Sequence, residues 1–154
     1  MRLFALMILA AGLILAAAGT AAADHLTKVP GTWEMVSGER DGKPLPKEDV
    51  EHVMLICKAE GNAIRIVVKK HDKVVTEATA KLAKAGDKHD QYDITYSKGS
   101  DAKGESLKGK TVHGIIAVEG DTLKACWHGE EGFPKEFTGA KGSGCALRTY
   151  KRVK

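Results

Sequence analysis

The chain has 154 residues, 29% of them charged, and a formal net charge of +4 at pH 7. Lysines are interspersed with acidic residues along most of the sequence, so the charge pattern argues against a nucleic-acid-binding face. None of the three cysteines forms a CxxC pair, which excludes the redox and zinc-knuckle motifs built on that spacing. The length predicts one domain around one hydrophobic core.

Residues 1–23 have the pattern of a cleaved signal peptide. Arg2 gives a positive start, an uncharged apolar run follows, and Ala21-Ala22-Ala23 supplies the small residues of a cleavage site before Asp24. The run is too short to predict a membrane span, although an uncleaved N-terminal anchor is the alternative. We therefore expect a bacterial protein that is secreted or periplasmic, whose mature domain is 24–154 and contains no membrane span.

The mature part has the pattern of successive short strands. Gly31–Ser37 alternates, with Trp33 and Met35 on one face, and is followed by a turn at Asp41-Gly42 and one helical turn at 46–50. Further strands are predicted at 52–58, 63–69, 74–82, 91–96, 111–119, 122–128 and 145–153. About eight sequential strands with almost no helix predict an all-β fold. A single antiparallel up-and-down β-barrel is favoured because closure removes exposed edges, with a two-sheet sandwich as the alternative.

One resemblance supports the barrel. Gly31-x-Trp33 at the start of the first strand resembles the opening of the lipocalin superfamily signature. In that superfamily a basic residue near the end of the barrel packs over the Trp, and either Arg148 or Arg152 is placed to do so here.

A wider pattern is more specific and covers nearly all of the mature chain. It comprises Gly31-Thr32-Trp33, Asp41-Gly42-Lys43-Pro44, Asp93-Ile94-Thr95, Lys108-Gly109-Lys110-Thr111, Gly120-Asp121-Thr122-Leu123, Pro134-x-Glu136-Phe137 and Gly142-Ser143-Gly144. The chain thereby resembles a family of small secreted domains of unknown function, found chiefly in planctomycete bacteria and thought to be lipocalin-like. The resemblance implies the fold and the export, and it brings no catalytic residues.

Residues 104–111 match the phosphate-loop pattern GxxxxGK[ST]. That motif functions only where a helix follows the loop, because the helix N-terminus holds the phosphates. The residues that follow, Thr111–Glu119, are β-branched and end in a hairpin turn, which predicts a strand. We therefore expect a flexible hairpin loop and no nucleotide.

A second pattern concerns His113, Cys126 and His128. If Gly120-Asp121 is a two-residue hairpin turn, His113 pairs with His128 and Ile115 with Cys126, so the three residues share one face. Two imidazoles and a thiolate suit zinc or copper. The opposite face of this hairpin is the more apolar one, so the three residues are expected outside the barrel. Surface histidines without metal are therefore favoured over a metal site, and no cofactor is expected.

The cysteines also suggest a disulfide between Cys126 and Cys145, which lie on consecutive strands. Simple alternation places Cys126 outside and Cys145 inside the barrel, which argues against the bond unless the intervening loop shifts the phase. Buried thiols that pack as small apolar groups are the alternative.

The sequence leaves the function between three classes. Trp33, Tyr92, Tyr96 and Trp127 are candidate walls of a cavity for a small apolar molecule in a non-enzymatic barrel. The same residues could instead fill the barrel of a cell-envelope module that binds a partner protein, or the His/Cys group could bind metal. No enzyme is predicted, since Gly142-Ser143-Gly144 lacks the form of a nucleophile elbow.

Overall fold

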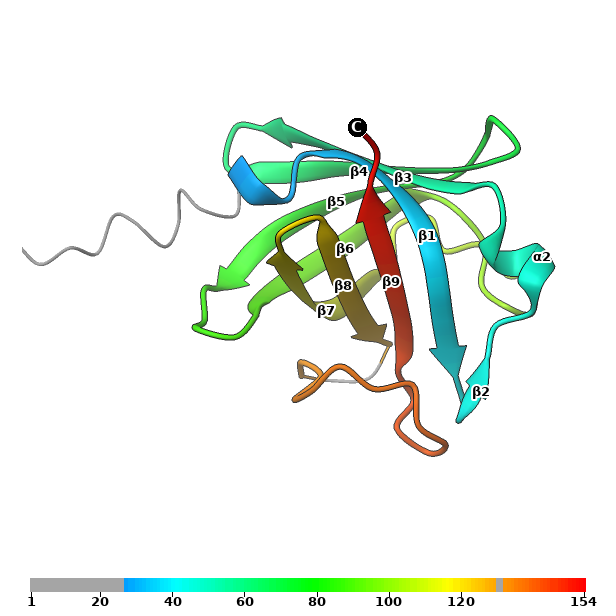
Figure 1. Ribbon diagram of the computed structural model, residues 1–154. Coiled ribbons are helices and arrows are strands. Elements are labelled where there is room, and N and C mark those ends of the chain that lie inside the picture. Colours follow the sequence, from blue (N-terminus) through cyan, green and yellow to red (C-terminus); the bar gives the residue numbers. More distant parts are fainter. Residues whose placement is uncertain (1–26, 130–131) are drawn as a thin grey trace, which may run out of the picture.

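The computed structural model describes residues 27–129 and 132–154, so the predicted signal peptide at 1–23 lies outside the described residues. One antiparallel sheet has the strand order β2-β1-β3-β4-β5-β6-β7-β8-β9, and β1 pairs in addition with β9. This last pairing closes eight strands into a barrel, and Figure 1 shows β9 between β8 and β1 at the closure. The predicted up-and-down barrel is confirmed, and the sandwich is wrong. In the described part of the chain, no helix has the length and apolar character needed to cross a membrane.

The strands agree with the predicted ones to within a few residues at their ends. The hairpin strands β7 and β8 have the predicted bounds, whereas β1 and β5 extend further, and a two-residue strand, β2, follows β1 as an added edge. The bounds are β1 Gly31–Arg40, β2 Lys43–Pro44, α2 Lys47–Val50, β3 Val53–Glu60, β4 Ala63–Lys70, β5 Lys73–Lys84, β6 Asp90–Lys98, β7 Thr111–Glu119, β8 Thr122–His128 and β9 Ala146–Arg152.

The register of two strand pairs matters for the site. In β7–β8, His113 pairs with His128 and Ile115 with Cys126, as predicted from the Gly120-Asp121 turn. In β1–β9 the register shifts at a bulge between Met35 and Ser37. A bulge inserts one extra residue and therefore reverses which residues face inward beyond it.

The buried residues form two clusters. The larger one lies inside the barrel and includes Trp33, Tyr92 and Tyr150. The smaller one comprises Ile115, Cys126 and Cys145, with Phe137 and Leu147 packed against it. Since the neighbouring residues Ile116 and Ala125 belong to the interior cluster, alternation places the smaller cluster on the outer face of the barrel.

The connection between β8 and β9 covers this outer cluster. Cys126 Sγ donates a hydrogen bond to the Thr138 carbonyl at 3.2 Å, and the Gly42 N–H donates to the Gly139 carbonyl at 2.7 Å. In Figure 1 the described part of this connection lies at the same end of the barrel as β2. The outward orientation of Cys126 was predicted correctly, but its burial under this connection was not.

Candidate ligand cavity

The two ends of the barrel interior differ, and one of them is sealed. Trp33 is fully buried there, and its indole Nε1–H donates a hydrogen bond to the Val29 carbonyl at 2.9 Å. The segment that leads into β1 is thereby fixed across the end of the barrel. Val29 itself is 3% exposed and belongs to the interior cluster, so this end is closed by packed side chains.

Arg152 completes the seal. Its guanidinium lies 4.0 Å from the centroid of the Trp33 ring, and it donates hydrogen bonds to the carbonyls of Pro30 at 3.0 Å and Lys28 at 2.7 Å. A cation over an indole face is attracted by the negative face of the ring. Of the two arginines that the sequence offered for the place over Trp33, the structure selects Arg152 and not Arg148.

A cavity of about 470 Å³ occupies the other part of the interior. Its inner walls are apolar, and its rim is formed where β1, β6 and β8 end at the opposite side of the barrel from the seal. The inner walls include Met35, Leu55, Cys57, Ile66, Val68, Ala78, Ile94, Val112, Ile116, Leu123 and Ala125. Most of its polar residues lie toward the rim, whereas Tyr150 lies deeper, paired with Met35 and Leu123. The polar lining residues are Arg40, Asp41, Thr76, Tyr96, Ser100, Asp101, His128, Arg148 and Tyr150.

Small side chains contribute to this empty volume. Ala78 on β5 lines the cavity, and it pairs with Ile66 on one side and Tyr96 on the other. Ala80, two residues further along the same inward face, is fully buried and does not line the cavity. The boundary between cavity and packed interior therefore falls between these two alanines.

The four predicted wall residues divide between the two ends. Tyr96 and Trp127 line the cavity. Trp33 and Tyr92 are fully buried and do not line it, because they belong to the packed interior at the sealed end. The structure therefore places two of the four at the cavity and the other two in the packed interior at the closed end.

Arg148 is the only buried charged side chain in the described part of the chain, with 8% exposure. It lines the cavity, and its guanidinium carbon lies 5.5 Å from the centroid of the Trp127 ring. Its Nη1 donates to its neighbour's carbonyl, Leu147, at 2.8 Å and to the Glu39 carbonyl at 3.4 Å. Burial lowers the pKa of Arg148, and the positive charge of Arg40 lowers it further.

Arg40 is the rim residue that sequence reasoning missed. Counting from Trp33 and Met35, simple alternation places residue 40 on the outer face. The bulge between Met35 and Ser37 reverses the phase, so that Arg40 pairs with the buried Ala146 and lines the cavity. Nothing in the local sequence marks this bulge, so only the pairing with β9 reveals it.

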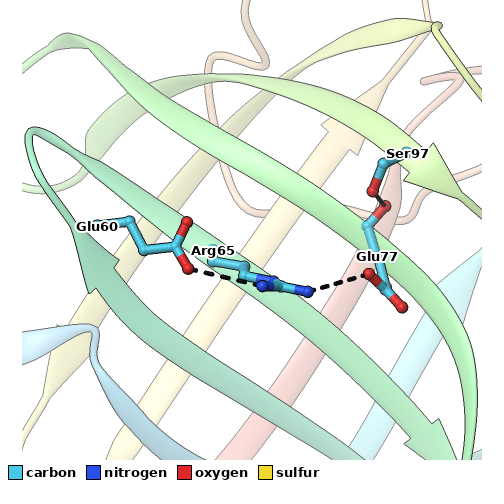
Figure 2. Close-up of polar contacts among 4 residues, drawn as sticks. All are labelled: Glu60, Arg65, Glu77 and Ser97. Carbon is cyan, nitrogen blue, oxygen red and sulfur yellow. Dashed lines mark hydrogen bonds and ion pairs between the residues drawn. The ribbon is translucent and has the colours of Figure 1, made fainter.

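On the outer surface, by contrast, an arginine is paired with acidic side chains. Arg65 on β4 lies between Glu60, at 3.7 Å, and Glu77, at 3.3 Å, and Figure 2 shows the guanidinium between the two carboxylates. Ser97 Oγ donates to the backbone carbonyl of Glu77 at 3.3 Å, which extends the contact to β6. These exposed groups brace neighbouring strands and leave no unpaired charge.

His113 and Cys126, two of the three residues of the metal alternative, are engaged in other contacts. His113 Nδ1 lies 2.8 Å from Asp93 Oδ1, and the His113 ring packs edge-on against Phe133. Cys126 is directed into the outer cluster, where burial raises its pKa to about 11. Within 27–129 and 132–154, no three His, Cys, Asp or Glu side chains are grouped to hold a metal ion.

The cysteine prediction has a divided outcome. Cys145 belongs to the outer cluster beside Cys126, so its expected inward orientation is wrong and the geometric objection to a disulfide falls away. Cys126 Sγ donates to the Thr138 carbonyl and Cys145 Sγ donates to the Ser143 carbonyl at 3.4 Å, and all three cysteines are free in the structure. The disulfide itself stays a prediction.

Residues 104–111 form a loop that enters a strand. Gly104 and Gly109 have φ values of 83° and 80°, and Asp101 Oδ1 accepts hydrogen bonds from the N–H groups of Lys103 and Glu105. These backbone hydrogen bonds hold the pKa of Asp101 below its ordinary value. Because β7 and not a helix follows, the loop lacks the element on which a phosphate loop depends.

The fold and the cavity define the class of protein: a single closed antiparallel barrel with one sealed end and one end that opens to an apolar cavity. No protein-family model matches the chain, and no curated protein matches it. The geometry of the cavity is therefore the basis on which the function is inferred.

Proposed function

We propose that this protein is exported from a bacterial cell and binds a small, mainly apolar molecule in its barrel without transforming it. The supporting observation is the cavity of about 470 Å³. Ligand sites in proteins generally have volumes of roughly 300–1,000 Å³ and apolar walls with a few polar groups. A barrel filled by its own side chains, as an envelope interaction module would have, leaves no such volume.

The binding mechanism follows from the two ends. The seal at Trp33 and Arg152 keeps water out of the inner end, so an apolar group in the cavity loses its contact with water. Each square ångström of apolar surface removed from water contributes roughly 25 cal/mol. The polar groups near the rim can then orient the part of the ligand that faces solvent.

The cavity chemistry favours binding over catalysis. Cys57 is the one thiol that lines it, and burial raises the pKa of this thiol to about 12. A thiol attacks as the thiolate, so Cys57 stays almost entirely in its unreactive form at neutral pH. This supports the non-enzymatic role.

Titration with N-phenyl-1-naphthylamine, a neutral apolar dye that fluoresces in apolar surroundings, tests the proposal. We expect saturable binding by the mature protein and loss of binding in Ala78→Leu, whose larger side chain fills part of the cavity. Thr79→Leu is the matched control, because residue 79 is the outward-facing neighbour of Ala78 on β5. No saturable binding, or equal binding by both variants, would favour the filled-barrel interaction module instead.

Export is tested separately, by expressing the full chain in a bacterial host and measuring the intact mass of the product. We expect a protein in the periplasm or medium whose mass corresponds to a chain beginning at Asp24. A full-length product retained in the cell membrane would contradict the predicted cleavage.

A further inference from the structure

The cavity holds two arginines that no acidic side chain neutralises. Every ion pair in the described part of the chain involves other residues, so neither Arg40 nor Arg148 has a carboxylate within 4.0 Å there. Asp49 is the carboxylate whose charge reaches Arg148, and it is bound at 3.2 Å by Lys70. The contrast with Arg65, which lies between two carboxylates, shows that pairing is available elsewhere on this barrel (Figure 2).

A buried guanidinium without a counter-charge is unfavourable. A guanidinium is effectively always protonated, so it cannot avoid the cost of desolvation by releasing a proton. The hydrogen bonds of Arg148 leave from Nη1 alone, and both acceptors are neutral carbonyls. Nε and Nη2 of Arg148 make no hydrogen bond to the described residues, and the residue lines the cavity.

His128 follows Trp127 at the same rim, but it pairs across the hairpin with His113 on the outer face, so its side chain is not counted with the two arginines. The acidic residues of the rim do not compensate Arg40 and Arg148. Asp101 Oδ1 is bound by its own loop, and Asp41 is exposed in the turn between β1 and β2.

The position of these groups along the barrel indicates how a ligand would lie. On β9 the inward-facing residues from rim to seal are Ala146, Arg148, Tyr150 and Arg152, so Arg148 lies on the rim side. Arg40 pairs with Ala146, one step closer to the rim. Apart from Tyr150, the walls between this level and the seal are apolar, as Met35, Leu55 and Leu123 illustrate.

We infer that the ligand is a single-chain anionic amphiphile. Its carboxylate or phosphate head group binds to Arg148 and Arg40, and its apolar chain extends into the cavity toward Trp33. The planar guanidinium matches both kinds of oxyanion through paired N–H···O hydrogen bonds. This inference rests on the proposed function and narrows its ligand class.

Displacement of bound N-phenyl-1-naphthylamine by four amphiphiles of equal chain length tests the inference: decanoate, decyl phosphate, decanol and decyltrimethylammonium. We expect decanoate or decyl phosphate to bind at least about tenfold more tightly than decanol, since hydrogen bonds to charged groups stabilise more than neutral ones. The tighter of the two anions identifies the head group. Equal or tighter binding of decanol or of the cation would overturn the inference while leaving the proposed apolar binding in place.

Two variants separate a specific contact from net charge. Arg148→Gln should weaken binding of the favoured anion about tenfold or more and leave decanol unchanged. Arg65→Gln removes the same charge from the outer face and should change neither. Equal effects of the two variants would overturn the inference.

Arg40→Gln, at the half-buried rim position, replaces Arg148→Gln if the latter does not fold. A thermal melt of each variant shows whether it is folded before titration. If the wild-type protein binds neither the dye nor any of the four amphiphiles, the proposed function itself fails, and the inference fails with it.

Discussion

Each end of β9 carries an arginine that lies near a tryptophan of a neighbouring strand, but the surroundings of the two arginines differ. At the sealed end, Arg152 lies 4.0 Å over the Trp33 ring and donates to two carbonyls of the segment before β1. At the open end, Arg148 lies 5.5 Å from the Trp127 ring, with only Nη1 engaged. One arginine thus joins two chain segments, whereas the other keeps donors without an acceptor among the described residues, which is what the proposed anionic ligand requires.

Side-chain packing also differs between the sealed half and the open half of the barrel. Trp33, Tyr92 and Ala80 are fully buried in the sealed half and do not line the cavity. In the open half, the inward residues of the same strands enclose about 470 Å³. The side chains of the open half therefore lack packing contacts that those of the sealed half make. A ligand in the cavity would provide such contacts.

The largest expected effect comes from removing the seal. Arg152→Met should lower the free energy of unfolding by about 3 kcal/mol, because the carbonyls of Lys28 and Pro30 lose their charged donor and Trp33 loses its cation. Urea unfolding followed by tryptophan fluorescence measures this. Arg65→Met, on the exposed outer face, should change stability by no more than about 1 kcal/mol. Similar effects of the two variants would show that Arg152 does not hold the end closed.

A smaller effect on the free energy of unfolding is expected when two alanines on β5 are replaced by leucine. Ala80→Leu forces additional atoms into the packed half and should lower the free energy of unfolding by about 2 kcal/mol. Ala78→Leu adds the same atoms next to the cavity and should change stability by less than about 1 kcal/mol, since space is available there. Urea midpoints of the two variants measure the difference. If Ala78→Leu is the more destabilising, the position of the boundary between cavity and core is wrong.

Much of this architecture was predictable because strand alternation and turns are local signals. The Gly120-Asp121 turn fixed the β7–β8 register, and Trp33 with Met35 identified the inward face of the first strand. A Gly-x-Trp start also indicated that an arginine would cover Trp33, although it left two candidates. The choice of Arg152 depended on the exact phase of β9, which alternation alone does not determine.

The cavity was not predictable in the same way, because it depends on what several distant strands leave unfilled. Arg40 enters it only through the bulge after Met35, and bulges depend on pairing with the partner strand. Likewise, the burial of Cys126 and Cys145 arises from the β8–β9 connection, whose position on the outer face is a long-range contact. Hence the sequence indicated candidate aromatic walls but could not separate Tyr96 and Trp127 from Trp33 and Tyr92.

Alkaline pH should weaken the interior through its buried acids. Burial raises the pKa of Cys57 from 9.0 to about 12, and it raises the pKa values of Tyr92 and Tyr150 in the same direction. Above about pH 9 the unfolded chain loses the Cys57 proton while the folded chain keeps it, so stability falls by up to about 1.4 kcal/mol per pH unit for this group. Urea midpoints between about pH 8 and 10 measure the slope.

Cys57→Ala provides the control for that slope. The variant should unfold at lower urea at every pH because of the lost packing, but its midpoint should decline less steeply above about pH 9. The tyrosines, whose ordinary pKa is higher than that of a thiol, account for the decline that remains. An unchanged slope in Cys57→Ala would mean that this thiol ionises equally easily in the folded and unfolded chains.

The smallest expected effect is an increase in the free energy of unfolding, opposite in sign to the effect of removing Arg152 from the seal. Arg148→Met should raise the free energy of unfolding by about 1 kcal/mol, because an apolar side chain avoids the desolvation of an unpaired charge, and this outweighs two hydrogen bonds to neutral carbonyls. Urea unfolding of the ligand-free proteins measures the gain. Added decanoate or decyl phosphate should then stabilise the wild-type protein and not the variant, since only binding to the folded state raises stability. A loss of stability in Arg148→Met comparable to that in Arg152→Met would mean that both arginines serve the fold, and the difference between the two ends would then lie in packing alone.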